Sequence, residues 1–524
     1  MNTIIKAFII LSIIWIGCIN VNGQAPTIQW QKFLGGSNGD YATSIIQTTD
    51  GGYAVAGYTF SSDGDVSGWH AGIDQDGNPT SDFWLARLDS AGNLLWEKCY
   101  GGSDEEEANA VIQTADGGFA LAGFAYSHDG DITFNHAAGD YWVVKTDASG
   151  VLQWQKCYGG NNTDYAYSIV QTTDHGYAVA GYAKSPDGNL NNNHGGADYW
   201  LMRIDSIGLI LWQKNYGGTA DDEAHSIVMT ADGGFTLAGY SSSNNIDVSV
   251  NHGDKDYWLM HTDSTGTLLW QKSYGGSGED NLLSMNKTLD SGYIMAGYTY
   301  SDDNDVSGNH DNTGNTKDYW IVKTTDSGSI QWKYCYGGTC DDEAEYIIQT
   351  NDGGYLVTGY TCSTDGDVTG FHGGYDYWIL KLNNLGQIQW EQCYGDSLNE
   401  YATCGIPTTD GGYAICGQGD TNNVDYWIVK LNTTITAVPD LTTTDYSIIY
   451  PNPFSNKTTL KITGLNEDVF VAIYDLSGKE VEQFLANGKK EIIIDREQLQ
   501  SGMYFYKVFD KNTILIANGK FVVE

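Results

Sequence analysis

The sequence predicts an all-β protein: a seven-bladed β-propeller closed by an N-terminal outer strand, followed by a small C-terminal β-sandwich. Three observations support this. Paired tryptophans recur at a fixed spacing, glycine-rich turns separate short alternating segments, and the pattern changes after residue 431. With 65 Gly, only 7 Pro and 13% aromatic residues, the composition favours many short strands joined by tight turns.

The repeat is an Asp-aromatic-Trp segment followed twelve residues later by a second tryptophan. Six copies are complete: Trp84/Trp96, Trp142/Trp154, Trp200/Trp212, Trp258/Trp270, Trp320/Trp332 and Trp378/Trp390. Trp30 carries only the second half and Trp427 only the first, so together they complete a seventh unit. Such repeats bury their faces by stacking radially, as the blades of a propeller do.

Each repeat is expected to form four antiparallel strands, as in residues 110–114, 119–123, 141–145 and 151–156. The segment Asp116-Gly117-Gly118 suits a tight hairpin, because glycine adopts positive φ without strain. Residues 27–32 should form the outer strand of the blade that contains Trp427. The two ends of the ring would then be hydrogen-bonded together.

Two short segments resemble those of known propellers. Residues 89–96 (DSAGNLLW) resemble the tryptophan-docking repeat of quinoprotein-like propellers, and residues 48–53 (TTDGGY) partly resemble the Asp-box of sialidase propellers without its Thr-Trp ending. Both are typical of the fold and imply no site residues here. A quinone-dependent oxidoreductase is a further functional hypothesis, and only the resemblance to the docking repeat supports it.

Residues 1–23 have the layout of a cleaved signal peptide: Lys6, an apolar run over 7–16, and small or polar residues up to Gly23. The protein is therefore expected to be exported. An alternative is lipid attachment at Cys18, although Trp15 stands where such sites usually carry Leu. No later apolar segment is long enough to span a bilayer.

The propeller is expected over residues 24–431, a Thr-rich linker over 432–446, and a second domain over 447–524. Four segments of that domain, around 450–454, 471–479, 500–508 and 519–524, closely resemble the type A C-terminal sorting domain of the Bacteroidetes type IX secretion system. The residues that carry the resemblance are Pro451, Asn452, Pro453, Gly478, Gly502, Tyr504, Gly519 and Lys520. The resemblance implies recognition by the type IX machinery, removal of the domain, and release or attachment to the outer cell surface. The alternative is an ordinary immunoglobulin-like accessory domain.

Of the net charge of −40, −38 belongs to the repeat region, where residues 24–439 contain 16 Lys and Arg and 54 Asp and Glu. Such a field repels nucleic acid and anionic membranes, and it favours cations or basic partners. Solubility is the simpler explanation.

Nine cysteines include Cys18 in the predicted signal peptide. Four others share one position in separate blades and should be free thiols: Cys99, Cys157, Cys335 and Cys393. Two disulfides, Cys340–Cys362 and Cys404–Cys416, fit predicted hairpins, and the sequence decides neither.

The loop of variable length within each repeat is the candidate binding face, because loops on a rigid scaffold usually carry function. Six blades place Asp or Asn five residues before a histidine, and the first of these loops also holds Trp69, which could stack on a sugar ring. The candidate ligand-binding residues are Trp69, His70, His136, His194, His252, His310 and His372. Two further acidic sets are expected at the same face: one follows each outer strand, four residues past a Gly, and the other precedes each Asp-aromatic-Trp tryptophan.

Clustered carboxylates suit Ca²⁺, so the loops are also a candidate calcium site. The candidate ligands are Asp63, Asp65, Asp129, Asp131, Asp247, Asp303, Asp305, Asp365 and Asp367. The loops lack EF-hand spacing. Turn capping by Asp and one fixed hydrogen bond per His explain the same pattern. A His-bound transition metal is a third option.

These observations predict a secreted or cell-surface binding protein whose ligand is a glycan or a protein. The alternative is a secreted polysaccharide hydrolase or lyase using carboxylates of one or two blades. No nucleophile motif, no zinc signature and no carboxylate pair distinct from its repeat equivalents is recognisable, so binding is favoured over catalysis. No cofactor other than Ca²⁺ is indicated.

Overall fold

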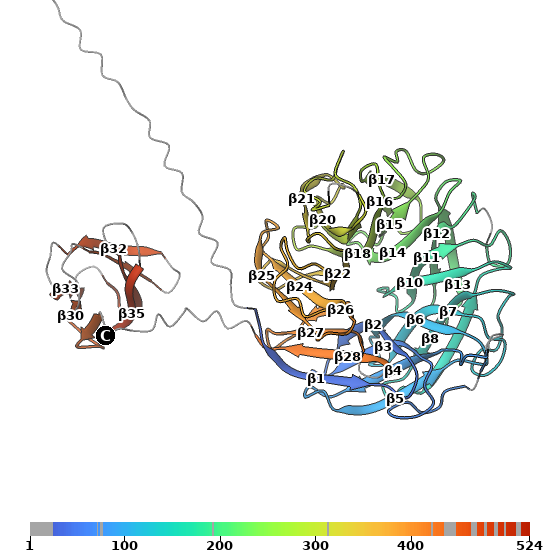
Figure 1. Cartoon of the computed structure of the whole chain (residues 1–524), viewed down its shortest axis with the longest axis horizontal. Helices are drawn as coiled ribbons and strands as arrows, with labels where there is room; N and C mark the ends of the chain where they lie inside the picture. The colour runs from blue at the N-terminus through green and yellow to red at the C-terminus, as the bar shows by residue number, and fades with distance from the viewer. Residues whose placement is uncertain are drawn as a thin grey trace, which may run out of the picture. The chain divides into compact units, whose positions relative to one another are not determined.

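The computed structural model describes residues 25–433, except 71, 74–76, 191–192, 312–313 and 421–422. It also describes residues 447–524, except 463–468, 476–478, 487–490, 497–498 and 510–514. The predicted signal peptide and most of the predicted linker lie outside these residues. The chain divides into two compact units, residues 1–435 and 436–524 (Figure 1).

Unit 1 contains seven four-stranded antiparallel sheets, called blades here and named by their strands. Six blades are continuous in sequence: β2 (Asp40–Gln47), β3 (Tyr53–Thr59), β4 (Asp82–Leu88), β5 (Leu94–Tyr100); β6 (Glu106–Gln113), β7 (Phe119–Ala125), β8 (Asp140–Thr146), β9 (Leu152–Tyr158); β10 (Asp164–Gln171), β11 (Tyr177–Ala183), β12 (Asp198–Ile204), β13 (Ile210–Tyr216); β14 (Asp222–Met229), β15 (Phe235–Ser241), β16 (Asp256–Thr262), β17 (Leu268–Tyr274); β18 (Asp280–Lys287), β19 (Tyr293–Thr299), β20 (Asp318–Thr324), β21 (Ile330–Tyr336); β22 (Asp342–Gln349), β23 (Tyr355–Thr361), β24 (Asp376–Leu382), β25 (Ile388–Tyr394).

The remaining blade joins the two ends of unit 1. It consists of β26 (Glu400–Pro407), β27 (Tyr413–Asp420), β28 (Val424–Leu431) and β1 (Ile28–Leu34), with β1 paired antiparallel to β28. Trp30 lies opposite Lys430, and Phe33 lies opposite Trp427. The predicted closure by an N-terminal outer strand is confirmed. The blades surround a centre to which the first strand of each, the inner strand, lies nearest (Figure 1).

Aromatic residues bind each blade to the next. The aromatic residue before each buried repeat tryptophan packs on the tryptophan of the following blade, as Tyr141 does on Trp200 at 4.3 Å between ring centroids. The Tyr141 hydroxyl also donates to the Trp200 carbonyl oxygen at 3.0 Å. The last such contact, Tyr426 with Trp84 at 4.4 Å, closes the ring. The predicted role of these tryptophans in packing between blades is confirmed.

The second repeat tryptophan packs on the following blade through a glycine. A Cβ on Gly150, in the turn between β8 and β9, would lie 2.7 Å from the Trp96 ring. Gly150 also has φ of 78°, which other residues rarely adopt. This contact explains why the docking segment has glycine at this point.

Unit 2 contains two antiparallel sheets that share one hydrophobic core. One sheet comprises β29 (Ser447–Tyr450), β30 (Lys457–Ile462) and β33 (Glu491–Asp495); the other comprises β31 (Phe470–Tyr474), β32 (Glu480–Leu485), β34 (Gly502–Phe509) and β35 (Leu515–Val523). The whole described chain is therefore all-β, as predicted. The described residues contain no helix with the length and hydropathy needed to cross a membrane.

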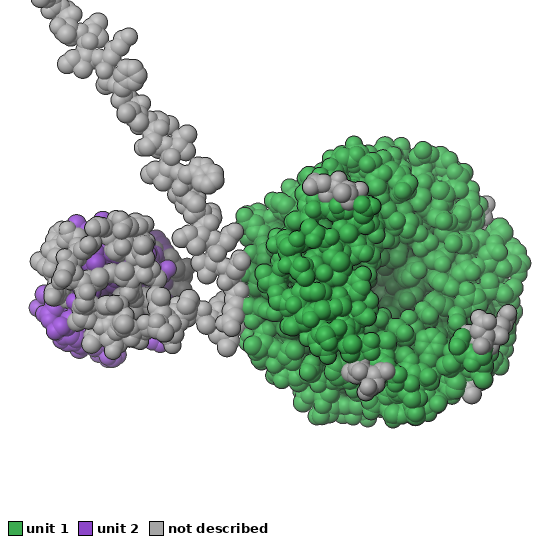
Figure 2. Space-filling view, viewed as in Figure 1, with its two compact units in different colours: residues 1–435 green, residues 436–524 purple. Residues whose placement is uncertain are grey.

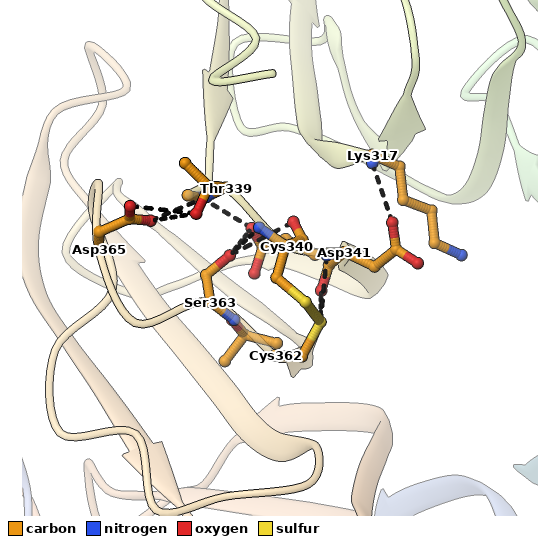
Figure 3. The surroundings of a disulfide bond; sticks show 10 residues. Lys317, Thr339, Cys340, Asp341, Cys362, Ser363 and Asp365 are labelled. Carbon is orange, nitrogen blue, oxygen red and sulfur yellow. Dashed lines mark hydrogen bonds between the residues drawn. A yellow bond between two sulfur atoms is a disulfide. The ribbon is translucent and has the colours of Figure 1, made fainter. Parts of the chain in front are cut away.

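One of the two candidate disulfides is formed. Cys340 and Cys362 are bonded with their Cα atoms 5.4 Å apart, next to Asp341 and Lys317 (Figure 3). Cys404 and Cys416 lie opposite each other on β26 and β27 but are free thiols. The four cysteines at the shared repeat position, Cys99, Cys157, Cys335 and Cys393, are free as predicted.

Candidate functional site

The variable loops pack on the connections that enter the inner strands. In the first loop, Asp65 N donates to Gly35 O at 2.8 Å, and Ser37 N donates to Asp63 Oδ1 at 2.7 Å. Gly35 and Ser37 belong to the connection from β1 to β2, whereas Asp63 and Asp65 lie between β3 and β4. The two kinds of connection therefore share one face, as the strand order predicted.

Most of the candidate calcium ligands accept hydrogen bonds within these loops. Asp129 Oδ1 accepts from Ser103 N at 2.8 Å, and Asp131 Oδ2 from Gly101 N at 3.3 Å. Asp303 Oδ1 accepts from Ser277 N at 2.7 Å, and Asp365 Oδ1 accepts from Thr339 N at 2.8 Å. Asp247 accepts from Gly217 N, and Asp305 forms an ion pair with Lys333. Asp367 donates its own amide to Gly337 O. Within the described residues, no group of three or more His, Cys, Asp or Glu side chains is arranged to hold a metal ion.

The six loop histidines each contact the buried aspartate that begins the third strand of their blade. The Nδ1–Oδ2 distances lie between 2.5 and 3.0 Å for His70–Asp82, His136–Asp140, His194–Asp198, His252–Asp256, His310–Asp318 and His372–Asp376. His70 Nε2 also lies 3.8 Å from Asp131 Oδ2 of the next blade. The histidines thus connect the loops to the blades.

Trp69 is half-buried. Its Nε1 donates to Thr80 O at 2.9 Å, and its ring packs against the core of the first blade. The two further acidic sets are mostly buried. Asp40, which begins β2, and Asp82, which begins β4, are both 0% exposed, as are most of their repeat equivalents.

A central channel runs between the inner strands of unit 1. It has a volume of about 780 Å³ and is lined by the inner strands; Figure 2 shows the hollow. The fourth residue of each inner strand lines it, and these residues differ from blade to blade: Thr43, Asn109, Tyr167, His225, Leu283, Glu345 and Thr403. Because the rest of the scaffold repeats, this position is where the ring loses its symmetry.

Three of these residues hold neighbouring blades together. Thr43 Oγ1 donates to Ala108 O at 2.7 Å, and Asn109 Nδ2 donates to Ala166 O at 2.8 Å. Thr403 Oγ1 donates to Ala42 O at 2.8 Å. The four consecutive blades from β10 to β25 carry Tyr167, His225, Leu283 and Glu345 instead. These larger side chains are directed to the channel rather than to a neighbouring backbone.

Tyr167 and His225 form a stacked pair in the channel wall, with ring centroids 4.6 Å apart and an interplanar angle of 11°. Two further tyrosines flank this pair: the Tyr182 ring centroid lies 6.0 Å from that of Tyr167, and the Tyr240 centroid lies 6.0 Å from that of His225. His225 Nε2 is buried without a hydrogen-bond partner among the described residues. Burial lowers the pKa of His225 to about 4, so its ring is neutral at pH 7.

Glu345 and Glu343 lie two residues apart on β22. Lys317 Nζ and the Tyr360 hydroxyl both donate to Glu343 Oε2. Glu345 has no hydrogen-bond partner within the described part of the chain, and burial, with the Glu343 charge nearby, raises its pKa well above the usual value for Glu. A carboxyl group whose burial favours its protonated form, a neutral imidazole and a tyrosine thus line one cavity.

Sequence analysis missed Tyr167, His225, Glu343 and Glu345. Each lies in a strand that reads as an ordinary member of the repeat. Comparison of the seven inner strands position by position would have found Tyr167, His225 and Glu345, because the fourth residue varies most widely in chemistry.

In unit 2, several of the predicted sorting residues connect the segment before β30 to β35 or pack between β34 and β35. Asn452 Oδ1 accepts from Val522 N at 2.8 Å, and Asn452 Nδ2 donates to Lys520 O. Pro451 O accepts from Thr458, and both Pro451 and Pro453 follow cis peptide bonds. The ring of Tyr504 stacks on that of Phe521 at 5.6 Å.

Two of the predicted glycines are described. Gly502 begins β34, and a Cβ on Gly519 would lie 2.5 Å from the Tyr506 hydroxyl. Gly478 lies outside the described residues.

Residues 448–524 match the family model described as the secretion system C-terminal sorting domain. The C-terminal unit is a type IX sorting domain. It marks the chain as cargo of the type IX machinery, exported and then secreted or attached to the cell surface. The sorting domain covers only the last part of the chain and does not classify the propeller-like unit.

The other comparisons show similarity of limited extent. The regulatory protein FlaEY of Caulobacter vibrioides is 23% identical over 364 residues, which cover 60% of this chain and 36% of FlaEY. This chain therefore spans about a third of the length of that relative.

Solved structures with a similar arrangement include a fungal alcohol oxidase of the AA5 family in complex with copper (11% identity, 95% of this chain and 100% of that one, TM-score 0.44). Sqt1 from Chaetomium thermophilum is a second (11% identity, 78% and 99%, TM-score 0.40). A third is a DUF4221 family member from Bacteroides vulgatus (9% identity, 78% and 98%, TM-score 0.33).

Proposed function

We propose that this exported protein binds a neutral glycan in the central channel of its propeller-like unit. The observation that carries the proposal is the loss of symmetry in four consecutive blades. There, Tyr167, His225 and Glu345 replace side chains such as Thr43 and Asn109 that hold the ring together. Polar side chains left unpaired at the wall of a cavity are available to a ligand.

The chemistry of these side chains suits a sugar. A carboxyl group and an imidazole accept and donate hydrogen bonds to hydroxyl groups, and tyrosine rings pack against the apolar face of a pyranose. The surplus of 54 acidic over 16 basic residues between 24 and 439 repels anionic polymers. A neutral glycan is therefore favoured over an anionic glycan or a nucleic acid.

The cavity lies toward the ends of the inner strands that are away from the variable loops. Its wall is formed by the fourth to eighth residues of these strands, as Thr43 to Gln47 show. At this end, glutamines on four inner strands accept hydrogen bonds from turns of neighbouring blades, as Gln113 does from Thr49 N at 2.9 Å. The ligand is therefore expected to enter from the face of these hairpin turns.

Affinity electrophoresis of the full chain in gels containing starch, xyloglucan, galactomannan or mixed-linkage β-glucan tests the proposal. At least one polysaccharide should retard the protein, and Tyr167→Ala combined with His225→Ala should weaken binding at least tenfold. Leu211→Ala is the matched control, because Leu211 is exposed on the outer strand β13. Equal retardation of wild type and double variant would contradict the channel as the site. Retardation by none of the four would reject neutral-glycan binding and favour a protein ligand.

The loop residues remain a second proposed contact surface. Ligand contact by His70 or Trp69 would be made by the outward atoms of side chains whose inner atoms already bond Asp82 and Thr80. Calcium binding by the loop aspartates is the alternative use of these loops, and the Discussion gives the measurement that would establish it.

A further inference from the structure

We propose that this protein has a second binding site, on the face of the variable loops, for a lysine side chain of a basic protein partner. The site consists of Tyr41, Tyr58 and Phe60 of the β2–β5 blade and Glu107 of the following blade. None of these four residues lines the central channel, so the proposal does not depend on the glycan binding proposed above.

Three aromatic rings lie together where the second strand of the β2–β5 blade ends and its variable loop begins. The Tyr41 and Tyr58 rings are stacked, with their centroids 5.0 Å apart. Phe60, the first residue of the loop, meets both edge-on, at 6.1 Å from Tyr41 and 5.9 Å from Tyr58. All three residues are partly exposed. Grouped rings of this kind attract cations, because the face of each ring carries partial negative charge.

The other blades show which cation such a ring takes. Between residues 24 and 439, three Lys or Arg residues lie outside the strands, and each lies over a tyrosine of its own blade. These tyrosines are the sixth residues of their second strands, as Tyr58 is. The distances from Nζ to the ring centre are 5.3 Å for Lys184 and Tyr182, 4.4 Å for Lys255 and Tyr240, and 4.4 Å for Lys317 and Tyr298.

Two of these lysines also bind an acid of the following blade. Lys317 Nζ donates to Glu343 Oε2, and Lys255 Nζ lies 2.9 Å from Glu279 Oε1. A tyrosine ring of one blade and a carboxylate of the next thus hold a lysine ammonium group between them. An ammonium group gains from both contacts, because the carboxylate supplies full charge and the ring shields the pair from water.

The junction after the β2–β5 blade has the ring and the acid but no lysine of its own. Glu107 is the second residue of its inner strand, as Glu343 is, whereas Phe60 and Ser81 stand at the two positions from which the other blades supply a lysine. Glu107 is partly exposed, and its carboxyl group has no hydrogen bond or ion pair among the described residues. It is therefore available to a cation from outside the chain.

The electrostatics of the two kinds of junction differ accordingly. Burial raises the pKa of Glu107 to about 7, and the Glu105 charge adds to the increase. Burial also raises the pKa of Glu223, but there a hydrogen bond from Tyr240 and the charge of Lys184 oppose the increase. After burial, the Glu107 charge is the largest cause of the raised pKa of the Tyr58 hydroxyl, which places this carboxyl group close to the ring.

Other junctions place a second ring where the lysines lie. Tyr165 stacks on Phe124 with centroids 3.9 Å apart, and Tyr401 meets Tyr360 edge-on at 4.8 Å. Gln418 takes the place of the ring in the last blade. Among the described residues, a ring and an acid at this position without a lysine therefore occur together at one junction only.

The partner class follows from the shape and the charge of the surroundings. The equivalent junctions hold an unbranched lysine side chain that comes from the variable-loop side, so a surface lysine of a partner can reach Tyr58 from the same side. Residues 24–439 carry 54 acidic and 16 basic residues, a surplus that attracts a basic protein and speeds its association. A lysine-rich protein is thus favoured over a neutral or acidic one.

Fluorescence anisotropy of a labelled pentalysine peptide, titrated with the full chain at low ionic strength, tests the site. Glu107→Gln should weaken binding at least about fivefold, and Tyr58→Leu about threefold. Glu97→Gln is the matched control with the same change of charge. Glu97 accepts from Trp84 Nε1, and Gln155 plays this part in another blade, so this control should change binding less than about 1.5-fold.

Ser81→Lys tests the same site without removing a residue from it. It supplies a lysine at the position of Lys317, which should occupy the site and weaken peptide binding at least about fivefold. Ala91→Lys, in an exposed turn of the same blade, adds the same charge and should weaken binding less than about 1.5-fold. If the two lysine variants bind the peptide equally, Ser81→Lys contradicts the site.

Equal binding by Glu107→Gln and Glu97→Gln would overturn the proposal, because the peptide would then respond only to net charge. Absence of peptide binding by the wild type would overturn it as well. A glucosamine trimer is titrated in parallel, since its amino groups offer the same ammonium chemistry. Binding of the trimer that depends on Glu107, with no such binding of pentalysine, would overturn the protein partner and assign the site to an amino sugar.

Discussion

Lys145 and Asp116 form an ion pair that joins the third strand of the β6–β9 blade to the turn between its first two strands. Lys145 Nζ lies 2.9 Å from Asp116 Oδ2 and 2.7 Å from Thr146 O, and the side chain is buried. Burial opposes ionisation of Asp116, but hydrogen bonds from Thr114 and Lys145 hold its pKa at about 2. The same pair recurs in five other blades: Arg87–Asp50, Arg203–Asp174, Lys323–Asp290, Lys381–Asp352 and Lys430–Asp410.

Lys145→Met should destabilise unit 1 by roughly 1–3 kcal/mol, because Asp116 and Thr146 O lose a buried donor while the aliphatic packing is kept. Urea unfolding of the full chain at pH 7 measures the change. Lys98→Met, at an exposed site on β5, should cost less than about 0.5 kcal/mol. Equal effects of the two substitutions would show that the ion pair contributes nothing.

The β14–β17 blade replaces this cation with a histidine. His261 Nε2 lies 3.7 Å from Asp232 Oδ2, and its Nδ1 is 3.0 Å from the Thr236 hydroxyl. His261→Lys should restore a permanent charge and raise stability by about 0.5–1.5 kcal/mol at pH 8. Urea unfolding at that pH measures it. A loss of stability would mean that the Thr236 hydroxyl, which also lies 2.8 Å from the Tyr293 hydroxyl, needs the imidazole.

Two hairpin turns lack the glycine that most blades place at positive φ. His175 and Ser291 have φ of 65° and 71°, whereas Gly117 has 84° at the equivalent position. Ser291→Gly and His175→Gly should each stabilise unit 1 by up to about 1 kcal/mol, because left-handed backbone is strained for residues with a Cβ. Thermal unfolding measures the gain, and the reverse change Gly117→Ser should cost a similar amount. A lower midpoint in both glycine variants would refute the strain.

Buried acids should make stability fall from pH 5 toward pH 8. Burial raises the pKa of Asp164 to about 6, although hydrogen bonds from Ser185 oppose the increase. Burial also raises the pKa of Asp280 to about 7 and that of Glu106 to about 8. At any pH between the ordinary pKa near 4 and the raised pKa of the folded protein, the folded state binds more protons than the unfolded state. Stability is therefore present at low pH and lost as pH rises through the folded values.

The turn aspartates set the acid limit, since their lowered pKa values give stability that is lost as pH falls below about 4. Urea midpoints from pH 3 to pH 8 should therefore pass through a maximum near pH 5. Asp164→Asn should flatten the alkaline side of that curve. A midpoint that rises steadily to pH 8 would contradict the assignment.

Calcium should change the thermal midpoint of the full chain by less than about 1 °C, because loop carboxylates such as Asp63 and Asp129 already accept backbone amides. Unfolding in millimolar Ca²⁺ and in chelator measures it, with Asp65→Ala/Asp131→Ala/Asp367→Ala as the comparison. A clear rise with Ca²⁺ that the triple variant abolishes would establish the loops as calcium sites.

The sequence determined the scaffold, because its signals are local and repeated. Trp142 and Trp154 mark strands, Gly117 marks a turn, and seven copies of that pattern leave few ways to bury the aromatic faces. The sorting domain was also recognisable, since Asn452 and Tyr504 occur in a fixed order at the end of the chain. The separated halves at Trp30 and Trp427 even indicated how the ring closes.

Only the tertiary structure decided which polar groups are available to a ligand. In sequence, His70 and Asp82 look like surface groups, yet the fold buries the aspartate and pairs the two. Conversely, His225 and Glu345 look like members of ordinary strands, and the fold places them on one cavity. Availability depends on the contacts that loops and strands make in the folded chain, so the sequence pattern alone cannot show it.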